Sequence, residues 1–300
     1  MTTARAGGKV ILLGEHAVVY GVPALAAGIE RGAVVEAEPS PQARLRLGEQ
    51  EVAVGDGSEL GQALDALLKS LGAPPLQMAV TLELPAGCGL GASAAMGVAL
   101  ARAAATFCAE PRQESDVLAA AMAWEQVFHG NPSGVDAAAA ASGGCIQFTR
   151  GVGLELVTLA RPLELVLAVA GLPASTRAMV EGVARIKERR PEVFQKTLDG
   201  VQALVKNARL CLEAGDLPGL GQLMNLNQML LAGLHLSTEA IERACQVARD
   251  AGALGAKLTG AGGGGCIVAL ADLDPAPVLQ ALRGAGFECF ASTVKSRGEP

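Results

Sequence analysis

Residues 85–95 read PAGCGLGASAA, a turn with a glycine at every second position from Gly87 to Gly91 and with no charged side chain. The segment before it, MAVTLEL (78–84), alternates as a strand does, and residues 92–108 follow a helical pattern. A glycine turn between a strand and a helix leaves free backbone N–H groups at the helix N-terminus, where an anion is favoured. The stretch therefore predicts either a tight structural connection or a phosphate cradle.

The charge of a bound phosphate would have to be neutralised from outside this turn. No lysine follows the glycines, so the stretch lacks the GxxxxGK[ST] pattern of P-loops. A helix N-terminus alone contributes about 0.3–1 kcal/mol per exposed charge, and ~2 kcal/mol when partly buried. We therefore expect cations to reach the turn from other parts of the chain.

A second glycine cluster occurs in KLTGAGGGGCIVAL, residues 257–270. Gly260, Gly262 and Gly265 match the letters of the dinucleotide fingerprint GxGxxG, which should follow a strand and open a helix. Here a helical pattern precedes the cluster and a strand pattern follows it, so a Rossmann fold is not predicted. The cluster instead predicts a backbone surface that packs closely against another main chain or against phosphates.

Two carboxylates stand near a third loop, AWEQVFHGNPSGVDAAAA (123–140). Glu125 lies near the end of a predicted helix, and Asp136 lies at the head of an alanine-rich helix. Asp136 could be an ordinary N-cap and Glu125 an ordinary solvated side chain. If both converge on the phosphate turn, they would suit Mg²⁺, which prefers oxygen ligands and bridges carboxylates to phosphates.

Composition and net charge indicate which kinds of partner the protein can bind. The chain has 300 residues, enough for two domains, and a net charge of −6 with no basic run longer than KERR (187–190), which argues against nucleic acid and anionic membranes. The early apolar run Val10–Leu13 is too short for a signal or membrane segment. The seven cysteines include no CxxC pair and the three histidines are scattered, so we expect reduced thiols, no zinc site and a cytoplasmic protein.

The order of predicted elements indicates an α+β protein. Strands and helices alternate in the first half, whereas the second half has long helical segments (191–215 and 237–252) and two closing strands (266–271 and 287–292). This change in the order of predicted helices and strands begins near residues 150–162.

The stretches KVILLGEHAVVYG (9–21), PAGCGLGASAA (85–95) and KLTGAGGGGCIVAL (257–270) resemble, in this order and spacing, the three motifs of the GHMP kinases. The resemblance spans nearly the whole chain. It implies a two-domain GHMP kinase fold of the α+β class that holds ATP in a cleft. Residues 1–157 would resemble domain 2 of ribosomal protein S5, and residues 158–300 would be ferredoxin-like.

The resemblance also implies roles for single residues. Asp136 matches the catalytic aspartate and Lys9 the lysine that pairs with it and stabilises charge at the attacking oxygen. Ser93 and Glu125 match the residues that meet Mg²⁺. The positions of the ATP-phosphate loop are Pro85, Gly87, Gly89, Leu90, Gly91, Ala92, Ser93 and Ala94.

The acceptor substrate would meet a second group of residues. Glu15 and His16 form the GEH of the first motif, and Thr176 in PASTR matches a threonine of the acceptor site; Lys9 and Asp136 complete this group. Alternatively, His16 is a core histidine and Thr176 a helix cap.

Two positions depart from the family pattern. Ala92 stands where the second motif usually has its first serine, which removes one possible phosphate hydrogen bond. Ala174 stands where animal members carry an arginine, so substrate contacts there would differ.

The implied reaction is an in-line transfer of the γ-phosphoryl group of ATP to an alcohol. GEHAVVYG and HGNPSGVD are most similar to the branch of the family that phosphorylates the C5 hydroxyl of mevalonate in isoprenoid biosynthesis. Homodimers are common among such proteins, so we expect one here.

Two alternatives stay open at this point. A kinase of phosphomevalonate would need further cations, for which Arg177, Lys187 and Arg189 are the nearby candidates. A non-catalytic ligand sensor of the same fold would be expected to lack the lysine or one of the two carboxylates, and this chain has all three.

Overall fold

The computed structural model describes residues 1–85, 87–129, 134–172 and 174–296. Its contacts divide the chain into two units, which we describe one at a time. The first unit comprises residues 1–8, 31–85 and 91–143, and the second comprises residues 9–30, 86–90 and 144–300. The boundary expected between residues 157 and 158 stays a prediction, because this division groups residues by their contacts rather than by chain order. Residues 9–30 and 86–90 group with the C-terminal half because the first two motifs contact the third, as shown below.

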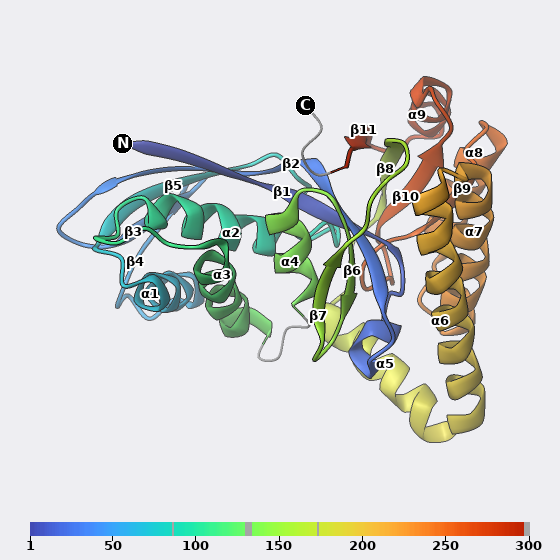
Figure 1. Cartoon of the computed structure of the whole chain (residues 1–300), viewed down its shortest axis with the longest axis horizontal. Helices are drawn as coiled ribbons and strands as arrows, with labels where there is room; N and C mark the ends of the chain where they lie inside the picture. Colours follow the sequence, from blue (N-terminus) through green and yellow to red (C-terminus); the bar gives the residue numbers. More distant parts are fainter. Residues whose placement is uncertain (86, 130–133, 173, 297–300) are drawn as a thin grey trace. The chain divides into compact units, whose positions relative to one another are not determined.

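The described residues form eleven strands, nine α-helices and one 3₁₀ helix, joined by turns and loops (Figure 1). The strands are β1 (Thr2–Leu13), β2 (Ala24–Pro39), β3 (Arg44–Leu47), β4 (Gln50–Ala53), β5 (Leu76–Leu82), β6 (Cys145–Thr149), β7 (Gly153–Leu156), β8 (Leu163–Gly171), β9 (Gly255–Leu258), β10 (Gly265–Ala271) and β11 (Cys289–Val294). The helices are η1 (Ala17–Tyr20), α1 (Glu59–Leu71), α2 (Ala92–Ala105), α3 (Glu114–His129), α4 (Val135–Ser142), α5 (Thr176–Arg189), α6 (Pro191–Ala214), α7 (Leu217–Gly233), α8 (Glu239–Asp250) and α9 (Ala276–Gly284).

The first unit combines part of a mixed sheet with four helices. β3 pairs antiparallel with β4 and parallel with β5, and β5 pairs antiparallel with residues 33–39 of β2. α1 and α2 both pack on α3, and α4 packs on α2. β5 and α2 flank the glycine turn in the sequence, and α2 begins after Gly91, its N-cap, which has φ +73°.

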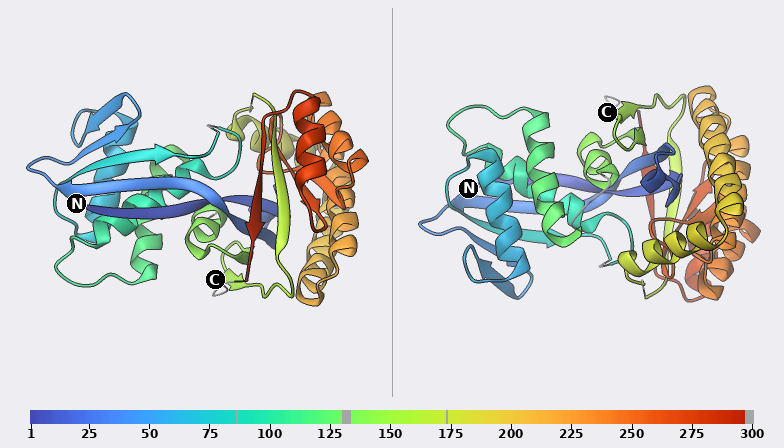
Figure 2. Two further views of the ribbon diagram at one scale, coloured as in Figure 1. Left: turned by 90° about the horizontal axis from the view of Figure 1, so that it is seen from above. Right: turned by 90° about the horizontal axis from the view of Figure 1, so that it is seen from below.

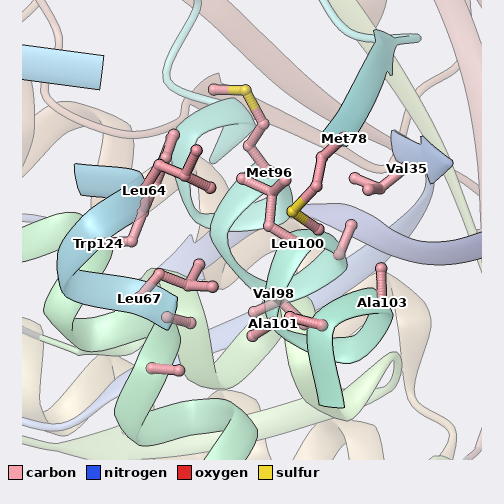
Figure 3. Packing of buried hydrophobic residues seen from close by; sticks show 14 of the residues in the cluster. Val35, Leu64, Leu67, Met78, Met96, Val98, Leu100, Ala101, Ala103 and Trp124 are labelled. Atoms are coloured by element: carbon pink, nitrogen blue, oxygen red, sulfur yellow. The ribbon is translucent and has the colours of Figure 1, made fainter. Parts of the chain in front are cut away.

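Aliphatic side chains and one tryptophan form the core of this unit (Figure 3). Aromatic residues make up only 3% of the chain, so alanines on α2 allow the helices to approach closely. Gly97 faces Trp124 of α3, and a Cβ atom at Gly97 would lie 2.8 Å from Trp124 Cδ1. Glycine at position 97 therefore makes room for the indole ring, which is completely buried.

We expect Gly97→Ala to destabilise the first unit. Alanine improves helix propensity by about 0.5–1 kcal/mol, but the clash with the tryptophan should cost about 1–3 kcal/mol as overpacking. Denaturant unfolding measures the net loss. The matched control is Gly182→Ala in the middle of α5, where the nearest atom to a new Cβ is 3.7 Å away on the flexible Arg185 side chain. Equal stabilisation by both substitutions would contradict this account.

The second unit is built on a four-stranded antiparallel sheet in the order β11-β8-β10-β9. Helices α7, α8 and α9 cover one face of this sheet, and α6 packs on α7 (Figure 2). Every residue of β10 is buried. In the same unit, residues 24–27 of β2 pair with β6, which pairs with β7. The segregation of helices and strands predicted for an α+β protein is confirmed.

The prediction of a helix directly before the second glycine cluster was wrong. α8 ends at Asp250, and Gly252 follows with φ +97°, a left-handed conformation that favours glycine. The chain then enters the four-residue strand β9, which is buried throughout, so the glycines form a turn between two strands. The exclusion of a Rossmann fold still holds, because the cluster opens no helix.

Two sequence expectations concern cysteines and membrane segments. All seven cysteines are free, as expected. Burial raises the pKa of the Cys145 and Cys245 thiols to about 12, so both stay protonated at neutral pH. Over the residues described, no helix has both the length and the apolar character needed to cross a membrane.

Candidate active site

Lys9 of the first motif is fixed on the glycine turn. Its amide donates to the Leu90 carbonyl at 2.9 Å, and its Nζ donates to the Gly89 carbonyl at 3.0 Å. Lys9 is only 2% exposed. A buried ammonium held against a main-chain turn provides the positive charge that the turn itself lacks.

The third motif packs directly against the same turn. Gly89 has φ +77°, and a Cβ atom there would lie 3.2 Å from the Thr259 carbonyl oxygen. Gly260 has φ +85°, and a Cβ atom there would lie 3.2 Å from the Gly89 Cα. Glycine is needed on both sides, because a side chain on either would be crowded and conformationally strained. The prediction that the second glycine cluster packs against another main chain is confirmed.

Thr259 joins the third motif to the first. Its Oγ1 accepts from the Ile11 amide at 2.8 Å and lies 3.3 Å from the Ile11 carbonyl, to which the hydroxyl donates. One side chain thus satisfies both backbone groups of Ile11, and Thr259 is 2% exposed.

A buried ion pair lies beside this contact. The Lys257 ammonium pairs with the Glu15 carboxylate, and neither side chain is exposed to solvent. Burial lowers the pKa of Lys257, and the adjacent Glu15 carboxylate opposes that change. The second Glu15 oxygen accepts from Asn227 Nδ2 at 3.1 Å. Both oxygens of a predicted substrate residue are therefore engaged within the protein.

His16 has a strained backbone and a buried ring. It adopts φ +59° and ψ −42°, a conformation that non-glycine residues rarely adopt. Its Nε2 lies 2.8 Å from the Ala261 carbonyl in the third motif, and the residue is 8% exposed. Burial lowers the pKa of the imidazole, while the hydrogen bond and the nearby Glu15 carboxylate oppose that change.

In the first unit, Ser93 and Glu125 are brought together by the packing of α2 on α3. Ser93 Oγ donates to Glu125 Oε1 at 2.5 Å, and the indole Nε1 of Trp124 donates to the same hydroxyl at 3.3 Å. Ser93 and Gly97 are one turn apart on α2, so the glycine that receives Trp124 also sets this contact. Glu125 is 4% exposed, so the solvated alternative for it is excluded.

Asp136 lies in the first turn of α4, and the N-cap position belongs to Gly134, which has φ +88°. The alternative that Asp136 is the N-cap is therefore wrong. A carboxylate in the first turn is stabilised by the positive end of the helix dipole. The loop before it, Gly130–Ser133 of the HGNPSGVD stretch, lies outside the described residues.

The other predicted loop and acceptor positions differ in exposure. Leu90 and Ala94 are 1% exposed, whereas Gly87 is exposed. Gly91, with φ +73°, is the N-cap of α2, whose first residue is Ala92. Pro85, Gly89, Ala92 and Ser93 are half-buried.

Thr176 is the first residue of α5 and is exposed. Its alternative as a helix cap is wrong, because Ser175 holds that position.

Comparison with known proteins identifies the family. The model for the N-terminal domain of GHMP kinases matches residues 59–144, and the model for their C-terminal region matches residues 207–286. The mevalonate kinase of Thermococcus sibiricus is 32% identical over 98% of this chain and 96% of its own length. The chain is a GHMP kinase. The mevalonate kinase of Methanothermobacter thermautotrophicus is 34% identical over 89% of each chain.

A solved structure agrees with this assignment. The L. major mevalonate kinase in complex with R-mevalonate has a TM-score of 0.89 and 32% identity, covering 100% of this chain and 97% of its own. The two-domain GHMP kinase fold of the α+β class, expected from the three motifs, is confirmed. The chain is thus an ATP-dependent small-molecule kinase.

Sequence reasoning missed three residues of this GHMP kinase. Lys257 and Thr259 lie inside the third motif, but only their glycine neighbours attracted attention. Asn227 lies in α7, a helix that was not predicted. A charged residue in an otherwise apolar four-residue strand was the available signal for Lys257, whereas nothing in the sequence marks Asn227.

We expect His16 to make stability depend on pH. The folded pKa lies below the ordinary value, so the unfolded chain binds a proton first as the pH falls below about 6.5. The stabilisation is complete above that pH and is lost at lower pH by at most about 1.4 kcal/mol per pH unit. Denaturant unfolding from pH 7.5 to 5.5 measures it, and His16→Asn should flatten the profile.

The control is His235→Asn, since His235 also has φ +59° but is exposed. Asparagine is among the non-glycine residues most often found at positive φ, so the same substitution is used at both sites. If the free energy of unfolding changes with pH in the same way for wild type and His16→Asn, the buried ring does not contribute to the pH dependence of stability.

Proposed function

We propose that this GHMP kinase transfers the γ-phosphoryl group of ATP to the C5 hydroxyl of (R)-mevalonate, giving 5-phosphomevalonate for isoprenoid biosynthesis. The observation that carries the proposal is the nearly full-length likeness, at 32% identity, to proteins named mevalonate kinase, one of them solved with R-mevalonate. The geometry within each unit supports it. Cytoplasmic location and a homodimer stay predictions.

In the first unit, Ser93 and Glu125 would hold Mg²⁺. They offer a hydroxyl and a buried carboxylate with oxygens 2.5 Å apart. No group of three or more His, Cys, Asp or Glu residues with metal-site geometry occurs among the residues described. Mg²⁺ typically takes one or two protein carboxylates and completes its shell with phosphates and water, so a buried carboxylate beside a hydroxyl is a suitable pair of ligands. Bound there, Mg²⁺ would neutralise phosphate charge.

Backbone groups would cradle the phosphates. The first intrahelical bond of α2 runs from the Ala95 amide to the Gly91 carbonyl, and no side chain among the described residues caps the helix. The amides of residues 92–94 therefore have no partner within the helix and suit an anion. In the second unit, Lys9 on the glycine turn supplies a fixed positive charge.

Asp136 would receive the proton of the acceptor hydroxyl. General-base help is worth about 10²–10⁴-fold. Because phosphoryl transfer proceeds through a loose transition state, the same carboxylate can act mainly by orienting the hydroxyl. We assign acceptor binding in the second unit to Lys9, His16 and Thr176. Glu15, whose two oxygens are engaged by Lys257 and Asn227, would support this group from behind.

Asp136→Asn should abolish turnover while leaving ATP binding intact. We expect the wild-type protein to release ADP from MgATP with mevalonate, but not with phosphomevalonate, galactose or homoserine. For the variant with mevalonate, we expect kcat to fall about 10²-fold or more. A coupled ADP assay and calorimetric titration with an ATP analogue measure the two properties. Asp116→Asn, in the first turn of α3, is the matched control and should keep full activity.

The acceptor that is turned over decides between the alternatives. Turnover of phosphomevalonate would keep the chemistry but change the substrate. Nucleotide binding without turnover of any acceptor would favour a ligand sensor.

Glu125→Gln should raise the Mg²⁺ concentration needed for half-maximal activity. Glutamine preserves an acceptor for Ser93 but removes the negative charge that attracts the cation, so excess Mg²⁺ should partly restore the rate. Titration of activity with Mg²⁺ at fixed ATP measures this. Glu114→Gln, exposed at the start of the same helix, should leave the titration unchanged. An unchanged titration for Glu125→Gln would exclude a metal role.

A further inference from the structure

Lys257 on β9 is a completely buried lysine that has no part in the substrate binding, metal binding or catalysis proposed for the other residues. Its ammonium donates to the carbonyl oxygens of Ile11 and Leu258 and to the carboxylate of Glu15. A lysine ammonium has three N–H donors, so all of them are used. The position of this one charge therefore fixes main-chain and side-chain atoms of the first motif at the same time.

Glu15 is held from two sides. Lys257 engages one carboxylate oxygen, and Asn227 Nδ2 donates to the other at 3.1 Å. Glu15 is 1% exposed. Because both of its oxygens are engaged within the protein, Glu15 is placed to act on a substrate through the residues beside it.

The residues beside Glu15 form a strained turn. The Ala17 amide donates to the Glu15 carbonyl at 2.6 Å, and the Val18 amide donates to the Gly14 carbonyl at 3.1 Å. Between them, His16 holds φ +59°. Such conformations cost about 1–3 kcal/mol and persist only where the surroundings over-determine them. Two adjacent side chains hold this turn: Glu15 is held by Lys257 and Asn227, and the His16 ring lies 2.8 Å from the Ala261 carbonyl.

We propose that Lys257 is a positioning residue for phosphoryl transfer: through Glu15 it fixes the turn of residues 14–19 and so places the His16 ring toward the acceptor. The part about the acceptor rests on the proposed function. The part about the turn rests only on contacts within the second unit. A purely structural ion pair is the competing account, since buried ion pairs can often be replaced by apolar side chains without loss of stability.

The double variant Glu15→Gln/Lys257→Met separates the two accounts. It removes both buried charges together, so neither is left uncompensated, and we expect it to keep the melting temperature near that of wild type. We expect kcat/KM for the acceptor to fall about 100-fold, as when a reacting group is misplaced by about an ångström. The KM for ATP should stay unchanged. Glu15→Gln/Lys257→Gln, which also removes both charges and keeps polar groups at both positions, gives the same comparison if the first double variant does not fold.

NMR of the histidine side chains gives a second measurement, which does not depend on turnover. The chain has three histidines, so NMR signals of labelled imidazoles can be assigned with His16→Asn. We expect the His16 ring of the double variant to leave its buried site and titrate with the pKa of an exposed histidine, about 6.5. The control Asp65→Asn/Lys69→Met removes an exposed ion pair on α1 with the same kinds of substitution, and should change neither readout.

The outcomes are distinguishable. A folded double variant with wild-type acceptor kinetics, or with unchanged His16 signals, overturns the positioning role. If the wild-type protein turns over no acceptor, the proposed function fails instead, and the His16 signals alone decide whether Lys257 fixes the turn.

Discussion

The contact between the first and third motifs, whose charged part is the buried ammonium of Lys257, is the constraint on which the second unit depends. A charge removed from water is tolerated only when it is paired and its hydrogen-bond donors are all used. Lys257 meets this condition with partners 242 and 246 residues away in the sequence, Glu15 and Ile11. The two chain segments must therefore meet in one register. Thr259, two residues further on, fixes the same register a second time, because its hydroxyl hydrogen-bonds to both the amide and the carbonyl of Ile11.

This register explains how an uncharged glycine turn can serve a kinase. Once β1 is fixed on β9, Lys9 lies on the turn, with its ammonium 3.0 Å from the Gly89 carbonyl. The turn itself is free to consist of glycines that approach the third motif closely. Charged groups thus come from regular elements, Lys9 from β1 and Glu125 from α3. Groups on such elements are placed more accurately than groups on loops.

The sequence predicted those parts of the site that depend on local patterns. Alternation before the glycine turn and helical spacing after it placed β5 and α2, and the alanine run placed α4 with Asp136 near its start. β9 was missed because four buried residues carry too little pattern to compete with the helical segment before them. α7, with apolar side chains on several faces, was missed because no clear period marks it. The engagement of both Glu15 oxygens was beyond prediction, because it depends on Asn227, 212 residues away.

The most direct test of this account is hydrogen exchange of single amides under native conditions. The amides of Lys9, Ile11, Leu258 and Thr259 donate to Leu90, Thr259, Gln228 and Cys266. If the three motifs open together, these four amides will exchange through one opening event and will report the same free energy of opening. That free energy will fall for all four in Thr259→Val. Fast exchange at Lys9 and Ile11, with continued protection at Leu258 and Thr259, would contradict it, because β1 would then open independently of the third motif.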